Sequence, residues 1–207
     1  MTGSWKTPGW GPGATDWADM VRARMFDRRV VFVSGTLDET AAGQAAMELM
    51  TLDASGDDPI HLQLDSPDGS LEAALSLMDI IDLAGVPVRG TCVGLVGGPA
   101  VGVLAVCTHR MATPHGRLRL AEPAGSFAGS AADLQRWAAH HRDRWQLFCR
   151  RLATAVGRPA DRVAQDLEAG RFLSADDAVE YGLIDEVCRP DADVYRLPGR
   201  PMGFQPR

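Results

Sequence analysis

The sequence predicts an α/β fold of repeated β-α units, with a mostly parallel sheet and one long protruding helix. Strand-like runs alternate with helix-like stretches over residues 30–108, an order best satisfied by parallel strands with crossover helices. A helical pattern then covers residues 131–156 without a break. The 207 residues, 45% of them hydrophobic, suffice for one compact domain and are few for two.

The first elements alternate in type. Val30–Gly35 is a β-branched run that ends in a turn, and Ile60–Ser66 alternates apolar with polar residues, so both are expected to be strands. Residues 36–54 and Leu71–Ala84 have small and apolar residues at helical spacing. Pro87–Gly94 is expected to be a third strand.

The uncharged stretch Gly90–Thr108 approaches the length of a membrane span. It is not uniformly apolar, because glycines and Pro99 divide it into a short strand, a tight turn and a helix of small residues. We therefore expect a buried β-turn-α unit and no membrane association. After it, His109 and His115 are expected to flank an arginine-rich loop, and a short strand is expected near Leu118–Leu120.

The second half of the chain is dominated by the helix expected over Ala131–Val156, which would be about 39 Å long. Such a helix outgrows its domain, so its apolar side is expected to pack against another chain. A short helix is expected within residues 157–170. Ser174 and Asp177 have the spacing of a capping box for the next helix, and residues 181–189 are expected to end the sheet.

The chain is expected to divide into a domain and two ends. Residues 1–18, rich in glycine and proline with three tryptophans, are expected to form a flexible arm. Residues 19–190 are expected to form the domain, with a handle-like region at about 125–156, and residues 191–207 a flexible tail.

Composition excludes several function classes. A net charge of −6 leaves no overall positive field for nucleic acid or an anionic membrane. Lys6 is the only lysine, which excludes Ser-Lys hydrolases and Schiff-base enzymes. The four cysteines stand far apart, so we expect no metal site, no cofactor and a reduced cytoplasmic protein. The opening residues contain no apolar core typical of a signal peptide, so export is not expected.

Five segments of the chain resemble one family. They are RRVVFVSG, SPDGS, GTCVGLVGGPA, Arg110–Pro123 and GRFLSADDAVEYGLIDEV. Over about residues 25–188 the chain resembles the proteolytic subunit of the Clp protease, a member of the crotonase-like superfamily. Enoyl-CoA hydratases of that superfamily share the middle turn but resemble the chain less after Ser126.

The resemblance implies a catalytic triad whose residues are missing here. In the family, a Ser attacks the peptide carbonyl, a His accepts the proton and an Asp orients the His. The corresponding positions are Gly98, Ala121 and Gly170. No serine occurs between Ser76 and Ser126, so no shift of the alignment supplies the hydroxyl. We therefore expect a catalytically degenerate member, a pseudoprotease.

The resemblance also implies an oxyanion hole made of two backbone N–H groups. One belongs to the residue after the nucleophile, which is Pro99 here and has no N–H. The other belongs to the glycine-rich turn, where Gly69 is present. Asp68 beside it adds a negative charge where the transition state would develop one.

We find no other constellation that replaces the triad. Cys92 and Cys107 are expected to be buried core residues. His140 and His141 are adjacent on a helix and face different directions, so a metal pair is not expected. GLVGG lacks the lysine and the spacing of a phosphate-binding loop.

Partners are implied by the resemblance as well. Family members form a seven-membered ring or double ring joined by the long helix, so we expect a homo-oligomer or a hetero-oligomer with active paralogues. The residues expected to contribute are Trp137, Trp145, Phe148, Glu168 and Arg171. Glu168 is followed by Ala169 where the family often has an arginine, so one inter-ring ion pair is half removed.

An AAA+ unfoldase is a possible further partner, with a weakened docking cleft. The matching positions are His61, Gln63, Leu83, Thr91, Val93, Met111 and Thr113. Because several are polar, docking an apolar loop there would recover less transfer free energy, at about 25 cal/mol per Å².

Three functional hypotheses remain open. The first is a non-catalytic subunit with a structural or regulatory role in a Clp-type chamber. The second is an active ATP-dependent serine-type endopeptidase subunit, or another hydrolase, with relocated catalytic groups. The third is a crotonase-like protein that binds acyl-CoA.

Overall fold

A parallel sheet forms the centre of the molecule. The computed structural model describes residues 14–123 and 128–188. Five parallel strands stand in the order β1-β2-β3-β5-β8. They are β1 Val30–Ser34, β2 Ile60–Asp65, β3 Val88–Cys92, β5 His109–Ala112 and β8 Glu186–Val187. The α/β class and the mostly parallel sheet predicted from the sequence are confirmed.

A second sheet, which we did not predict, holds three short strands in the order β4-β6-β7. β4 Leu95–Gly97 pairs in parallel with β6 Arg117–Arg119, and β6 pairs antiparallel with β7 Phe172–Ser174. Between β3 and β4 the chain bends at Gly94, where a Cβ would lie 2.4 Å from Asp65 Oδ1. That oxygen accepts a hydrogen bond from the Leu95 N–H at 2.9 Å, which fixes the bend.

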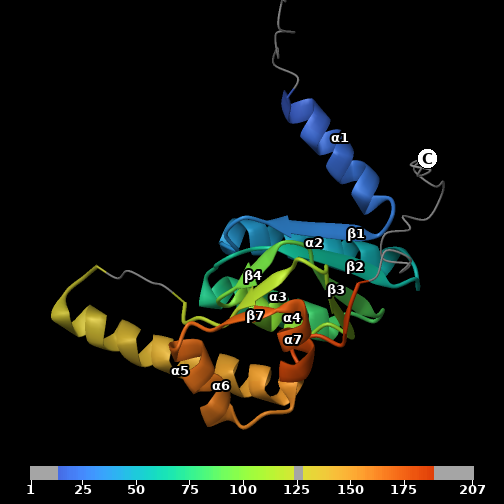
Figure 1. The fold of residues 1–207 in the computed structure, drawn as a ribbon. Coiled ribbons are helices and arrows are strands. Elements are labelled where there is room, and N and C mark those ends of the chain that lie inside the picture. The colour runs from blue at the N-terminus through green and yellow to red at the C-terminus, as the bar shows by residue number, and fades with distance from the viewer. Residues whose placement is uncertain (1–13, 124–127, 189–207) are drawn as a thin grey trace, which may run out of the picture.

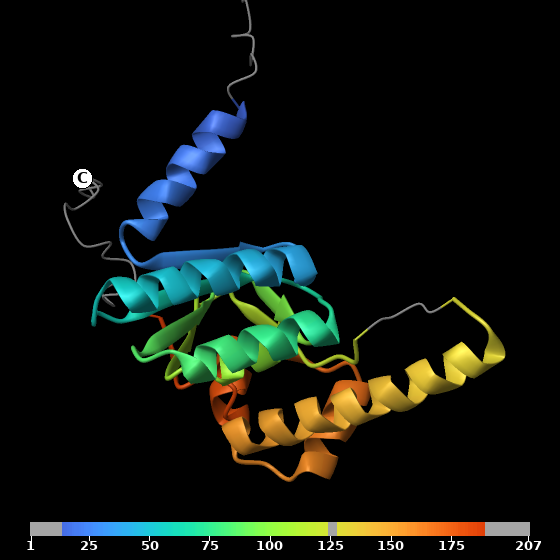
Figure 2. The same cartoon turned by 180° about the vertical axis from the view of Figure 1, so that it is seen from behind.

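Seven helices are present among the described residues. They are α1 Ala14–Phe26, α2 Glu39–Ser55, α3 Leu71–Leu83, α4 Ala100–Ala105, α5 Ala131–Val156, α6 Ala160–Glu168 and α7 Ala175–Tyr181. α2 and α3 lie side by side against the parallel sheet (Figure 2). α5 packs against α3 and α4 and extends beyond the body, while α1 projects from the side of β1 (Figure 1).

Capping residues explain where the helices begin. The predicted capping box of Ser174 and Asp177 is confirmed at α7. A second capping box, of Ser130 and Asp133, opens α5 at the predicted residue. α2 begins later than expected, because the Asp38 side chain accepts a hydrogen bond from the Ala41 N–H and caps the helix there.

Two predicted irregular segments contain regular structure. The range expected to be a loop between His109 and His115 begins with β5, because residues 109–112 pair with β3, and residues 111–112 also pair with β8. α1 begins at Ala14, inside the predicted flexible arm, because no glycine or proline follows Gly13 for many residues. Residues 1–13, 124–127 and the tail after residue 188 lie outside the described residues.

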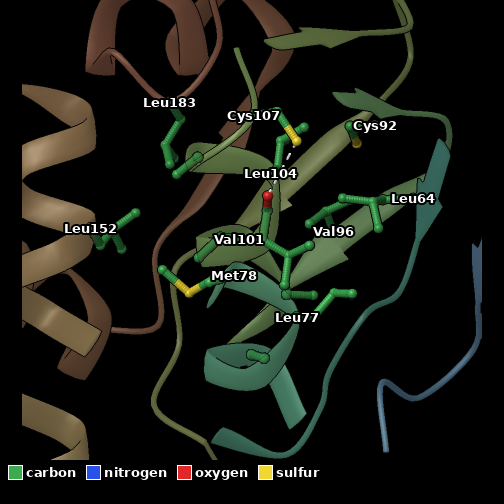
Figure 3. Close-up of a cluster of buried hydrophobic side chains, with 14 of the residues drawn as sticks. Leu64, Leu77, Met78, Cys92, Val96, Val101, Leu104, Cys107, Leu152 and Leu183 are labelled. Atoms are coloured by element: carbon green, nitrogen blue, oxygen red, sulfur yellow. Dashed lines mark hydrogen bonds between the residues drawn. The ribbon is translucent and has the colours of Figure 1, made fainter. Parts of the chain in front are cut away.

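The hydrophobic core lies between the two sheets and the helices that cover them. Figure 3 shows part of it, with Leu64 of β2, Met78 of α3, Val96 of β4 and Leu152 of α5 among the labelled side chains. α4, the helix of small residues, is buried throughout. A Cβ on Gly102 would lie 2.4 Å from Phe148 Cε2, so this glycine lets α4 and α5 pack closely. The predicted buried β-turn-α unit is therefore confirmed.

Candidate functional site

The second sheet brings the three triad-equivalent positions to one edge. Gly97, Arg119 and Phe172 stand in register across β4, β6 and β7. Gly98 follows β4, Ala121 follows β6 after one residue, and Gly170 precedes β7 by one residue. The Leu120 N–H donates to the Arg171 carbonyl at 2.8 Å, and the Gly98 N–H donates to the Arg119 carbonyl at 3.0 Å.

Two turns meet at this edge. The SPDG turn (Ser66–Gly69) follows β2, and the GG turn (Gly97–Gly98) links β4 to α4. The Gly97 N–H donates to the Ser66 carbonyl at 2.8 Å. A Cβ on Gly97 would lie 2.2 Å from the Pro67 carbonyl oxygen, so only glycine permits this approach.

Gly98 retains a backbone conformation suited to a sharp strand-to-helix turn. Its φ of +53° lies in the left-handed region, which favours glycine. A Cβ built on it would lie 2.8 Å from Asp68 Oδ1. The position expected for a nucleophile therefore has no side chain and faces a carboxylate.

The two oxyanion-equivalent positions, Gly69 and Pro99, offer only one N–H group between them, and this group already donates a hydrogen bond within the chain. Pro99 has no N–H to donate. The Gly69 N–H donates to Asp68 Oδ1 at 2.8 Å. The carboxylate expected from the sequence to oppose a developing negative charge thus also occupies the remaining donor.

The positions for the base and its orienting acid carry no ionisable group. Ala121 is buried and bears only a methyl group. Gly170 adopts a φ of +66°, and a Cβ added there would meet nothing within 4 Å. Side-chain proton transfer at this edge has no acceptor at either position.

The cysteines do not offer a replacement nucleophile. All four are free and buried, as expected for Cys92 and Cys107. Burial raises the pKa of Cys92 to about 12, and burial likewise raises the pKa of Cys107 to about 12. The reactive thiolate form is therefore negligible near neutral pH.

The histidines are dispersed. His109 contacts Glu186 at 3.0 Å, and His140 contacts Glu72 at 3.3 Å. His61 has a pKa below its usual value, because burial and the nearby Arg89 charge disfavour its protonated form. Within residues 14–123 and 128–188, no group of three or more His, Cys, Asp or Glu side chains is placed to hold a metal ion.

The structure brings together several docking-equivalent residues. Gln63, Thr91 and Met111 stand in register across β2, β3 and β5. Thr113 donates its hydroxyl to the Val93 carbonyl at 2.8 Å.

Exposure within the docking-equivalent set is uneven. Leu83 is 80% exposed, and His61 is half-buried beside β3. Thr91 and Met111 are buried under their neighbours, so within this chain they present little side-chain surface for docking.

The residues expected to mediate oligomerisation fall into two groups. Trp137 is 49% exposed on α5, and Glu168 is exposed on α6. Phe148 is wholly buried in the chain's own core and is corrected from an interface position to a core position. Trp145 stacks on Phe148, with ring centroids 5.6 Å apart, and lines a pocket of about 540 Å³ beside Pro123.

Arg171 takes part in a cluster that the sequence analysis missed. Its guanidinium lies 3.9 Å from the buried Asp166 carboxylate and 5.8 Å from the Tyr181 ring. The Tyr181 hydroxyl donates to Asp166 Oδ2 at 2.9 Å. Burial, together with this bond to an anion, raises the pKa of Tyr181 to about 12. Arg171 is thus held within its own chain, beside Gly170.

Comparisons with known proteins give matches that cover most of the chain. The model of the Clp protease family matches residues 13–191. The chain is 36% identical over 182 residues to the ATP-dependent Clp protease proteolytic subunit-related protein 2, chloroplastic, of Arabidopsis thaliana, a match that covers 86% of the chain and 64% of that relative. It is 30% identical over 176 residues to the ATP-dependent Clp protease proteolytic subunit 2 of Thermobifida fusca, covering 83% of the chain and 86% of that relative.

Two further findings bear on these comparisons. The chain spans less than two thirds of the length of the Arabidopsis relative. Among the residues that the structure describes, no helix is both long enough and apolar enough to cross a membrane.

Proposed function

The chain belongs to the Clp protease family, and from this premise we propose that it is a non-catalytic subunit of a Clp-type assembly. The proposal gives the chain a structural or regulatory role in a chamber of several subunits. One observation supports it above all others: the edge that collects Gly98, Ala121 and Gly170 holds no hydroxyl, imidazole or carboxylate at those positions.

The expected loss of catalytic rate for peptide cleavage is large. Removing the nucleophile from a serine protease lowers kcat by about 10⁶, and what remains comes from the oxyanion hole and substrate binding. Here Pro99 offers no N–H, and the Gly69 N–H is bonded to Asp68. That remainder is therefore expected to be lost as well. The raised pKa values of Cys92 and Cys107 weigh against a relocated thiol nucleophile.

The proposed assembly is a ring or double ring of this chain, with or without active paralogues. The exposed half of α5, with Leu134 41% and Trp137 49% exposed, supports contact with another subunit. An unfoldase is proposed as a weaker partner, since buried Thr91 and Met111 reduce the apolar surface available for docking. We also propose a cytoplasmic location, because four free cysteines suit a reducing compartment.

A paired experiment tests the proposal. The purified chain is incubated with a short fluorogenic peptide and with a fluorophosphonate probe, and a mock purification from the same host measures contaminating protease. We expect turnover no higher than the mock preparation and no labelling at any serine. Turnover at an ordinary enzymatic rate, with one labelled site on this chain, would overturn the non-catalytic assignment.

The assembly role is tested separately. The chain is co-expressed with an active Clp proteolytic subunit, and the complex is weighed by native mass spectrometry. Masses of mixed or homomeric rings are expected. A strictly monomeric chain in both samples would contradict the proposed role while leaving the absence of catalysis intact.

A further inference from the structure

We propose that Asp68 is a built-in occupant of the former catalytic site, where its carboxylate is bonded to the SPDG turn and lies beside the GG turn. One oxygen, Oδ1, takes the Gly69 N–H and fills the space that a side chain on residue 98 would need. The inference rests on the proposed function only in describing this site as formerly catalytic. Its test uses stability and hydrogen exchange, so it can fail while the proposed function stands.

The first observation is a hydrogen bond. Gly69 is buried, and its N–H donates to Asp68 Oδ1 at 2.8 Å. A buried amide left unpaired is costly, and a charged acceptor forms a stronger bond than a neutral one. The carboxylate therefore supplies the negative oxygen that a substrate would otherwise bring to this donor.

The second observation is independent of that bond and concerns space. A Cβ on Gly98 would lie 2.8 Å from Asp68 Oδ1, closer than real Cβ contacts allow. The next nearest atoms, Asp68 Cγ and Cα, would be at 3.8 and 3.9 Å, which is ordinary contact. A side chain at residue 98 would therefore require this one oxygen atom to move.

Hydrogen bonds hold the backbone of the SPDG turn, so Asp68 cannot move away from Gly98 by a simple backbone shift. The Asp68 carbonyl accepts hydrogen bonds from the Leu37 N–H and the Ser66 hydroxyl, both at 3.0 Å. The Ser70 N–H donates to the Leu37 carbonyl at 2.8 Å. Because the turn is fixed on both sides of Asp68, a side chain at residue 98 must rotate the carboxylate away, and the Gly69 N–H then loses its acceptor.

The chain offers a matched control for this coupling. Gly170 also has a left-handed backbone, with a φ of +66° against +53° for Gly98, but a Cβ there would meet nothing within 4 Å. Gly170→Ala therefore measures the backbone penalty alone. Gly98→Ala measures that penalty plus the displacement of the Asp68 carboxylate.

The experiment is a double-mutant cycle read by calorimetry of the full chain in its native oligomeric state. Gly170→Ala is expected to lower Tm by about 2–5 °C, and Gly98→Ala by roughly twice that. In the Asp68→Ala background, Gly98→Ala is expected to lower Tm only as much as Gly170→Ala does. Equal losses for Gly98→Ala and Gly170→Ala, or an excess that persists without Asp68, would overturn the proposal.

Hydrogen exchange provides a second readout, which can be used even if Gly98→Ala fails to fold. Asp68→Ala is expected to speed exchange of the Gly69 amide by about tenfold, as expected when a charged hydrogen bond is lost. Gly170→Ala, which leaves the bond in place, is expected to have no effect on that amide. Unchanged Gly69 exchange in Asp68→Ala would refute the hydrogen-bonded occupant.

Discussion

The two halves of α5 differ in how deeply their side chains are buried. In the carboxyl-terminal half, the buried residues are Phe148, Cys149, Leu152, Ala153 and Val156. In the amino-terminal half, Leu134 and Trp137 are 41% and 49% exposed, and none of residues 131–147 is buried. One continuous helix therefore serves two purposes: its second half belongs to the domain core, and its first half presents apolar surface to the outside.

Ion pairs join α5 to α3 from the middle of α5 toward its carboxyl-terminal end. Arg144 contacts Glu72, and Arg151 contacts both Asp79 and Asp82, so α5 is tied to α3 along its inner part. The pairs are partly exposed and are individually worth little. We call residues 131–147 the outer half and residues 148–156 the inner half of α5. We expect changes in the inner half to alter folding, and changes in the outer half to alter association.

The largest effect is expected from Phe148→Ala. This side chain is wholly buried against α4, and its removal leaves a cavity beside Gly102. Truncating a buried phenylalanine costs about 3–5 kcal/mol, or roughly 10 °C in Tm for a chain of this size. Calorimetry measures it, with a variant of the exposed Gln135 in the outer half, Gln135→Ala, as control, expected within about 0.5 kcal/mol of the parent. Similar losses from both would erase the distinction between the halves.

The next effect concerns association. Trp137→Ala is expected to leave Tm of the isolated domain nearly unchanged while weakening self-association or mixed-ring formation. An aromatic anchor at an interface contributes about 2 kcal/mol, which is about thirtyfold in Kd. Sedimentation across a concentration series measures it, and the exposed neighbour Gln135 gives the control variant Gln135→Ala. Unaltered association in Trp137→Ala would show that the outer half is not an interface.

A smaller effect comes from a motif that occurs twice. Ser174 and Ser130 each open a capping box, at α7 and α5 respectively. Losing such a cap costs about 1 kcal/mol where the helix end is coupled to the core. Ser174→Ala is therefore expected to lower Tm by about 2–4 °C, because Ala175 and Ala178 of α7 are buried. Ser130→Ala is expected to fray only the exposed end of α5, and an equal loss of Tm would contradict this.

The sequence predicted these elements unevenly, for physical reasons. α5 was placed at its observed bounds because a long helical period has a clear start at Ser130 and a clear stop at Gly157. The short strand expected near Leu118–Leu120 is found as β6, but the sheet to which it belongs was missed, because strands of three residues, such as β7, have too few positions for alternation to be visible. Its pairing joins residues far apart in sequence, which no local pattern reveals.

The candidate site shows the same division between local and tertiary information. The prediction that triad side chains are missing at Gly98, Ala121 and Gly170 rests on the resemblance alone. Phe148 was misassigned to an interface because helical spacing identifies an apolar face but not what covers it. From the sequence, Asp68 could be foreseen only as a nearby charge, since the closeness of its carboxylate to the Cβ position of Gly98 depends on how the turns after β2 and β4 meet.

The smallest expected effect is a pH dependence at the inner end of α5. Arg110 of β5 donates to the Ala155 carbonyl of α5 at 3.1 Å and to the Gly182 carbonyl at 2.9 Å. The same side chain pairs with Asp185. Partial burial opposes ionisation of Asp185, but the hydrogen bonds and charge of Arg110 outweigh it and hold the pKa of this carboxyl below its usual value.

A carboxyl whose pKa is lower in the folded chain stabilises the fold above its unfolded pKa of about 3.9, and this contribution disappears as the pH falls through the folded pKa. Tm of the parent is therefore expected to fall from about pH 5 downward, and Asp185→Asn is expected to remove part of that fall while lowering Tm slightly at pH 7.

Asp133 in the outer capping box, whose pKa is lowered by its hydrogen bonds to Ser130 and Arg136, supplies the control. Since Asp133 lies at an exposed helix end, where solvent weakens the contribution of its pKa shift, Asp133→Asn should change the acid limb of the Tm profile less than Asp185→Asn does. If Tm falls identically with acid in the parent and in Asp185→Asn, the pairing of Arg110 with Asp185 does not help to hold α5 against the sheet.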